Sequence, residues 1–182
     1  MNDEELVRKC IQKDRAAQKE LYVRFAGKMM GICLRYATGR DEAQDLLQDG
    51  FVKVFEKLGT FRGECGLGGW IKAVMINNAL DNFRKTRALR TIVEINENIH
   101  YYEDRGDLPG RLSEKELLEA IQRLPAGFRT VFNLYAIEGY NHNEIADMLQ
   151  IQPGTSKSQY ARARRSLQKM LTEENVTSEQ AG

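Results

Sequence analysis

The chain has 182 residues, enough for one domain or two small ones, and its 42% hydrophobic and 29% charged residues with a net charge of +1 are typical of a folded globular protein. No apolar run approaches the ~20 residues of a membrane span, and the acidic N-terminus lacks the apolar core of a signal peptide. The three cysteines form no CxxC pair, which argues against a disulfide framework and favours a reducing, cytoplasmic location. The two histidines have no metal-ligand spacing, so we expect no metal site, no cofactor and no enzyme activity.

The first predicted helix covers residues 21–36. Six of its residues follow the 3-4 spacing of one helix face: Leu21, Phe25, Met29, Ile32, Cys33 and Tyr36. Gly39 is expected to end this helix, and Asp41 is expected to cap the next one.

Residues 41–58 form a strongly amphipathic segment with a net charge of −3. At ~100° per residue its apolar residues gather on one side: Ala43, Leu47, Phe51, Val54, Phe55 and Leu58. The opposite side carries Asp41, Asp45, Gln48, Asp49, Val52 and Glu56. From these residues alone, the acidic side is either a solvated face or a surface for a basic partner.

Residues 59–69 predict a glycine-rich loop, which fits no phosphate-binding pattern and could be only a connector. A helix is expected from near Trp70 to about Arg87, with Asn77, Asn78 and Asn82 among apolar residues. Its end is basic, because residues 81–90 carry a net +3. Trp70 is expected to anchor the core rather than to offer a stacking platform.

Residues 93–112 lack a helical period and contain two glycines and a proline, and residues 93–119 carry a net −5. We interpret 93–112 as an acidic linker. Ser113 and Glu116 then have the spacing of a capping box, and Pro125 lies where a further helix begins.

The last two predicted helices, 140–149 and 154–171, have the proportions of a helix-turn-helix. The inner packing is expected from Ile145, Ala146, Leu149 and Ile151 of the first helix and turn, and from Ser156, Tyr160, Ala163 and Leu167 of the second helix. The opposite side of the second helix carries Lys157, Ser158, Ala161, Arg162 and Arg165. Residues 154–170 have a net +5, so this side can enter a major groove, although a helical hairpin with a solvated basic face has the same pattern.

Together these elements predict an all-α chain of two small helical domains joined by an acidic linker, the second domain being a helix-turn-helix domain. The expected boundaries are 1–92 for the first domain, 93–112 for the linker, 113–173 for the second domain and 174–182 for a polar, frayed tail. Two basic blocks divided by an acidic stretch suggest two separate contacts with a polyanion.

Over nearly its whole length the chain resembles the extracytoplasmic-function (group 4) class of bacterial sigma factors. The segment Tyr140–Ala146 and the run GT-x-KS-x-x-x-RAR from Gly154 to Arg164 look like region 4.2. The first half resembles region 2 at Asp41–Asp49 with Phe51 and Val54, at Phe61–Glu64, at Trp70–Ile71, and at Asn77, Asp81, Arg84 and Lys85. Ser156 departs from the pattern, because it stands where the family usually has an apolar residue on the buried face of the recognition helix.

The resemblance implies a transcription initiation factor without covalent chemistry, whose partners are core RNA polymerase, including its β subunit, promoter DNA and an anti-sigma factor. The face that docks on the clamp helices of the polymerase β′ subunit would be Asp41, Asp45, Gln48, Asp49 and Val52. Contacts with the −10 element, including a pocket for a flipped base, would come from Phe61, Arg62, Gly63, Glu64, Asn77, Asp81, Arg84 and Lys85. Contacts with the −35 element would come from Lys157, Ser158, Ala161, Arg162 and Arg165.

Two other functions stay open at this point. A helix-turn-helix regulator would bind duplex DNA without polymerase, but it gives no role to the acidic face and the glycine-rich loop. A helical adaptor without DNA contacts would depend on none of the basic residues 157–165.

Overall fold

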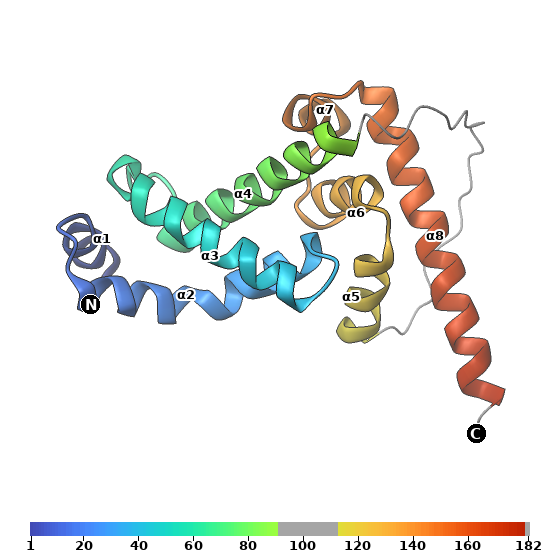
Figure 1. The fold of residues 1–182 in the computed structure, drawn as a ribbon, viewed down its shortest axis with the longest axis horizontal. Helices are drawn as coiled ribbons and strands as arrows, with labels where there is room; N and C mark the ends of the chain where they lie inside the picture. The colour runs from blue at the N-terminus through green and yellow to red at the C-terminus, as the bar shows by residue number, and fades with distance from the viewer. Residues whose placement is uncertain (91–112, 181–182) are drawn as a thin grey trace. The chain divides into compact units, whose positions relative to one another are not determined.

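The computed structural model describes residues 1–90 and 113–180, and these residues form helices and short connections without any strand (Figure 1). The all-α prediction is therefore confirmed. The chain divides into two compact units, Met1–Asn82 and Phe83–Gly182. The predicted linker at 93–112 lies outside the described residues, and the domain boundaries predicted from the sequence stay a prediction.

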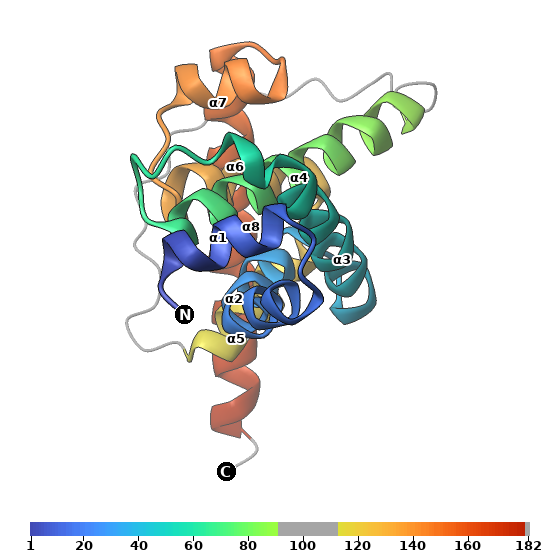
Figure 2. The same cartoon turned by 90° about the vertical axis from the view of Figure 1, so that its left-hand side faces the viewer.

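The first unit begins with α1 (Asp3–Ile11), which was not predicted from the sequence, and with α2 (Arg15–Tyr36), which starts six residues before the predicted helix 21–36 and ends at the same residue. α1 is capped by the Asn2 side chain, and α2 is capped by the Asp14 side chain, which accepts from the amide of Ala17 at 2.9 Å. α3 (Arg40–Lys57), the 3₁₀ turn η1 (Leu58–Thr60) and α4 (Leu67–Arg90) follow, and the division between the two units falls within α4, after Asn82. α1 and α3 both pack on α2 (Figures 1 and 2).

The junction between α2 and α3 differs from the prediction. The C-cap of α2 is Ala37, and Gly39 is the N-cap of α3, so Asp41 lies in the first turn of that helix instead of capping it. In the same turn, the Glu42 carboxylate accepts from the Thr38 backbone N–H at 2.7 Å and from the Thr38 hydroxyl at 2.6 Å. These bonds tie the residue before the N-cap to the first turn of α3, and the N-cap itself, Gly39, makes no side-chain capping bond.

α4 begins at Leu67, three residues before the predicted start. The carbonyl of Gly66 accepts from the N–H groups of Gly69 and Trp70 at 2.9 and 3.1 Å, which closes the first turn. Leu67 is buried and anchors that turn in the core. The connecting loop is therefore shorter than predicted and covers residues 61–66.

The core of the first unit joins all four helices. Its largest fully buried side chains are Leu6, Leu21, Leu58, Leu67, Ile71, Met75 and Leu80. α3 and α4 cross closely at Gly50, where a β-carbon would collide with the Met75 sulfur. This crossing places the acidic side of α3 on the surface.

The second unit contains α5 (Glu114–Arg123), α6 (Ala126–Phe132), the π-helical segment η2 (Asn133–Ile137), α7 (His142–Leu149) and α8 (Pro153–Gln180). The predicted capping box at Ser113 and Glu116 is confirmed, with both reciprocal bonds present. α8 contacts α5, α6 and α7. A core cluster of Ala120, Ile121, Leu124, Phe132, Ala163, Leu167 and Leu171 holds α5, α6 and α8 together.

Two helix ends in this unit also differ from the prediction. α7 begins at His142 rather than at Tyr140, because Asn141 and Glu144 form a capping box there. α8 starts one residue early, at Pro153, and continues through Gln180 where a frayed tail was expected. Proline suits the first turn of a helix, and no glycine or proline occurs between Gly154 and Gly182 to end it.

No helix in residues 1–90 or 113–180 combines the length and the apolarity required to cross a membrane. In the same residues, no group of three or more His, Cys, Asp and Glu side chains could hold a metal ion. Cys10 and Cys33 are buried, and burial raises the pKa of the Cys33 thiol to about 11, whereas Cys65 is exposed in the loop before α4.

Candidate polymerase and nucleic-acid interfaces

The acidic face of α3 is exposed as the helical period predicts. We define it by the five residues Asp41, Asp45, Gln48, Asp49 and Val52, all of which are exposed. Val52 is 56% exposed, so an aliphatic side chain lies on the surface among carboxylates. The opposite side of α3 is buried, which fixes the orientation of the helix. A face of this composition suits a partner that offers basic groups around an apolar contact.

The loop 61–66 is flanked by two aromatic residues, Phe61 at its start and Trp70 in the first turn of α4. The Phe61 and Trp70 rings meet edge to face, with centroids 5.7 Å apart. Arg62 and Glu64 extend into solvent, with side chains 83% and 79% exposed, and Gly63 has φ +74°, a conformation that favours glycine. Trp70 is half-buried and its ring contacts Phe61, and its expected role as a core anchor stays a prediction.

Four predicted −10 residues share one face of α4, because Asn77, Asp81, Arg84 and Lys85 follow the 4-3-1 spacing of a helix. Trp70 precedes Asn77 by seven residues and lies on the same face. At about 1.5 Å per residue, Lys85 lies about 12 Å along the helix from Asn77. The face therefore continues from the loop aromatics to the basic end of α4.

Two contacts of α4 with α3 were not found from the sequence. The Lys53 ammonium binds the Asp81 carboxylate at 2.8 Å, so Asp81 contributes to a tie between the helices. Asn78 is 5% exposed and donates from its amide to the Leu46 carbonyl at 3.0 Å. Asn77, its neighbour in the sequence, is exposed. The two asparagines differ in burial, and this difference separates the packing role of Asn78 from the predicted contact role of Asn77.

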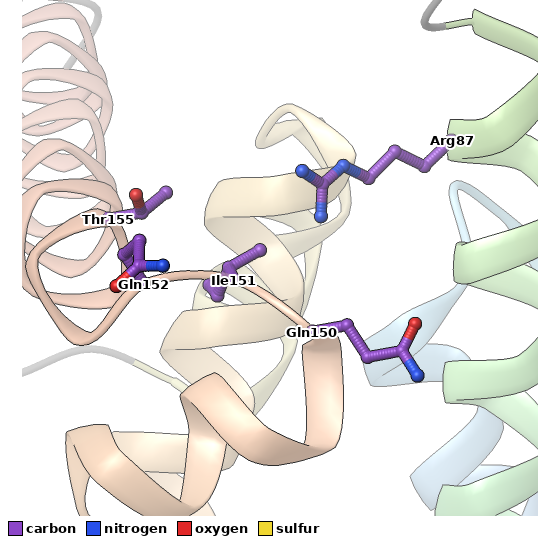
Figure 3. Close-up of a pocket in the computed structure, with 5 residues that line it drawn as sticks. All are labelled: Arg87, Gln150, Ile151, Gln152 and Thr155. Carbon is purple, nitrogen blue, oxygen red and sulfur yellow. The ribbon is translucent and has the colours of Figure 1, made fainter.

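The helix-turn-helix consists of α7, a tight turn and α8. Figure 3 shows the turn residues Gln150, Ile151 and Gln152, with Thr155 on the first turn of α8. Gln150 adopts a left-handed conformation with φ +54°, where a glycine would be less strained. The Ile151 N–H donates to the Ala146 carbonyl at 3.0 Å, which closes the end of α7. The turn thus keeps its geometry although its sequence lacks the usual glycine.

The predicted −35 residues occupy the outer side of α8. Lys157, Ala161 and Arg165 are exposed, and Ser158 and Arg162 are half-buried. The Arg162 guanidinium carbon lies 5.8 Å from the centroid of the Phe128 ring on α6, in cation–π range. The Ser158 hydroxyl donates to the Thr155 carbonyl at 3.0 Å, a contact within its own helix. Lys157, Ala161 and Arg165 are therefore exposed on the surface, whereas contacts with Thr155 and Phe128 restrain Ser158 and Arg162.

The inner side of α8 carries a polar contact that the sequence analysis missed. Ser156 is fully buried, and its hydroxyl lies 2.9 Å from Nδ1 of His142. The His142 ring stacks on Tyr135 with centroids 4.3 Å apart and planes at 9°. Burial, and then the charge of Lys157, lower the pKa of His142 below its ordinary value of 6.5.

Comparison with known proteins agrees with this arrangement. The family model described as "Sigma-70 region 2" matches residues 21–89, and "Sigma-70, region 4" matches residues 114–167. A relative in Pseudomonas aeruginosa, described as "RNA polymerase sigma-H factor", is 31% identical over 181 residues and covers 93% of each chain. A second relative, an "ECF RNA polymerase sigma-E factor" of Haemophilus influenzae, is 25% identical over 183 residues, which are 94% of this chain and 96% of the relative.

The fold is also similar to a solved structure. The sigma factor RpoE from Bartonella quintana, in a co-crystal with the anti-sigma factor NepR, has a TM-score of 0.51 and 22% identity. The match covers 85% of this chain and 96% of that chain. At this level of identity the likeness concerns the fold alone.

Proposed function

Because this chain belongs to the extracytoplasmic-function group of the sigma-70 family, whose members are transcription initiation factors that bind core RNA polymerase and direct it to promoters, we propose which of its surfaces make each contact. The observation that carries the proposal is the presence, on two separately packed units, of an exposed acidic helix face and an exposed basic recognition helix.

The acidic face of α3 binds the clamp helices of the polymerase β′ subunit. Its charge is complementary to a basic helical partner, and Val52 supplies an apolar contact at its C-terminal end. The opposite side of α3 is already covered by the unit's own core, which leaves this face for a partner.

The loop 61–66 and the outer face of α4 bind the −10 element. Arg62 and Glu64 offer hydrogen-bonding groups, and the Phe61 and Trp70 rings offer apolar surface to an unstacked base. Stacking on an aromatic ring stabilises each captured base by ~1–3 kcal/mol, which can help to open the duplex without covalent chemistry. Asn77 and Lys85 extend the contact along α4.

The outer side of α8 reads the −35 element in the major groove. Lys157, Ser158 and Ala161 lie near the N-terminal end of the helix, which recognition helices place against base edges. Arg162 can pair with guanine through two hydrogen bonds, and Arg165 is placed to contact phosphate.

We also propose that the factor acts in the cytoplasm with its polymerase and that an anti-sigma factor restrains it. The second point is supported by the fold neighbour, which was crystallised with such a partner.

The test is a pull-down of core polymerase with the full chain, followed by transcription from promoter libraries. We expect retention of the polymerase and start sites that share two sequence elements upstream. A variant in which residues 61–66 are replaced by a Gly/Ser linker of equal length should keep the polymerase but fail to open DNA in permanganate footprinting. Tight duplex binding by the chain alone, without transcription, would instead favour the regulator function.

A further inference from the structure

Ser156 is a polar residue in a place built for an apolar one. It lies in the first turns of α8, on the side that packs inward with Tyr160, Ala163 and Leu167, and it is fully buried. A serine inside a helix commonly satisfies its hydroxyl on the carbonyl four residues earlier. Here the hydroxyl meets Nδ1 of His142, 14 residues earlier on another helix, at 2.9 Å. The bond therefore joins the two helices of the helix-turn-helix.

His142 is itself held by its place in α7 and by aromatic neighbours. It is the first residue of α7 and lies between Asn141 and Glu144, the two members of the capping box. One face of its ring stacks on Tyr135 of η2, and Tyr135 in turn lies 4.5 Å from the ring of Tyr160 on α8. The ring thus has a fixed plane, and its Nδ1 atom is aimed at Ser156 rather than at solvent.

The position of Ser156 in α8 gives the bond a consequence beyond packing. The next residues in the chain, Lys157 and Ser158, lie on the outer side, and Ala161 follows one turn later. Because a helix moves as a rigid rod over such a distance, the contact that fixes Ser156 against α7 also fixes the rotation and tilt of these outer residues. Base readout through hydrogen bonds depends on that placement to within fractions of an ångström.

We propose that the His142–Ser156 hydrogen bond positions the N-terminal part of α8 for sequence readout at the −35 element, so that His142 and Ser156 are specificity-determining positioning residues. The inference rests on the proposed −35 role of α8. It extends that role to two residues that present no base-reading group themselves.

The experiment measures affinities of the reconstituted holoenzyme for its preferred −35 sequence and for a set of single-base −35 variants. The readout is the ratio of the two affinities, which is the discrimination. His142→Phe keeps a flat ring against Tyr135 but removes the nitrogen, and Ser156→Ala removes only the hydroxyl. Each is expected to reduce the discrimination about fivefold, the effect of one hydrogen bond.

Two further variants separate positioning from general stability. His142→Asn is the matched control, because its side-chain amide places a polar atom at the position of Nδ1, and it should keep the discrimination within about twofold of the unmodified chain. The double variant His142→Phe/Ser156→Ala should lose no more than either single variant, because both remove the same bond.

The outcomes distinguish the positioning role of the His142–Ser156 bond from the −35 role of α8. If the single variants lower the melting temperature but leave the discrimination unchanged, or if their losses multiply in the double variant, the positioning role is wrong. If the unmodified holoenzyme shows no −35 discrimination at all, the −35 role of α8 fails first. Circular dichroism identifies a variant that does not fold. In that case the discrimination of the remaining single variant, compared with that of His142→Asn, tests the positioning role.

Discussion

At the scale of single residues, two neighbouring asparagines of α4 have different surroundings. Asn77 and Asn78 are consecutive, yet Asn77 faces solvent on α4 and Asn78 is buried with its amide on the Leu46 carbonyl. A buried amide that loses its partner costs free energy, whereas an exposed amide exchanges its partner for water. The same contrast separates Ser156, which is buried against His142, from Ser158 on the outer side of α8.

The two asparagines give a matched pair of variants. Asn78→Ala should lower the free energy of unfolding by about 1–2 kcal/mol, because a buried hydrogen bond is lost. Asn77→Ala should change it by less than about 0.5 kcal/mol but should impair strand opening at the −10 element. Chemical denaturation and permanganate footprinting check the two effects. Normal opening with Asn77→Ala would remove this residue from the −10 contact.

Arg162 and Lys169 provide a second pair, on α8. Arg162 lies in cation–π range of Phe128 near the reading end of the helix, and Lys169 is exposed almost two turns further on. Arg162→Ala should cost ~1–3 kcal/mol of binding at one −35 position and relax the preference there. Lys169→Ala should weaken all promoters alike and flatten the salt dependence slightly.

The measurement for this pair is holoenzyme binding to single-base −35 variants at two salt concentrations. Equal losses for both substitutions on every variant would show that Arg162 does not read a base.

The lowered pKa of His142 predicts that folding stability depends on pH. Burial and Lys157 lower its pKa below 6.5 in the folded chain, so the unfolded chain binds a proton more readily. The stability that the lowered pKa of His142 contributes is therefore fully present above pH ~6.5. It is lost as the pH falls from there through the lowered pKa of the folded chain. Denaturation at a series of pH values should show a shallower decrease over this window for His142→Asn than for the unmodified chain. Parallel curves would contradict the prediction.

At the scale of elements, each helix has one side committed to its own unit and one side available. α3 buries Ala43, Leu47, Phe51 and Val54 and exposes carboxylates. α8 buries Ser156, Ala163 and Leu167 and exposes basic side chains. The amphipathic period therefore determines both the packing and the sign of the charge that a partner meets.

Charge reversal on α3 tests this surface. Asp45→Lys with Asp49→Lys should weaken binding of core polymerase at least tenfold, because like charges would then face the clamp helices. Helicity should persist, since both residues are exposed. The matched control is Glu4→Lys with Glu119→Lys, which changes the net charge equally through exposed residues of α1 and α5. If the control and the α3 variant lose equal affinity in the pull-down, net charge rather than this face is responsible.

At the scale of the whole molecule, the chain divides into two units that each have their own core. The first core is built around Leu21, Ile71 and Met75, and the second around Ile121, Phe132 and Leu167. Units with separate cores can unfold separately.

We therefore expect selective destabilisation by core truncation. Ile71→Ala and Leu167→Ala should each cost about 2–4 kcal/mol in their own unit, because each leaves a cavity at a fully buried site. In scanning calorimetry each substitution should shift one component of the unfolding transition and leave the other in place. A single transition shifted by both substitutions would show that the chain unfolds as one cooperative body.

The sequence by itself determined the helical class, the acidic side of α3, the basic side of α8 and the capping box at Ser113. Each of these depends on spacings of three or four residues within one helix, which the chain carries locally. Helix ends were predicted less well, because several neighbouring residues can occupy a capping position and only the folded backbone shows that Gly39 and Asn141 do so.

Only the tertiary structure decided how the candidate sites are supported. The pairs Lys53–Asp81, Leu46–Asn78 and Phe128–Arg162, and the bond between His142 and Ser156, join residues 14 to 34 positions apart. Such pairs depend on the rotation and the crossing point of two helices, and the hydrophobic period of either helix leaves both undetermined. The period tells which side of α8 is inward, but the contact with α7 decides how its outer side is held.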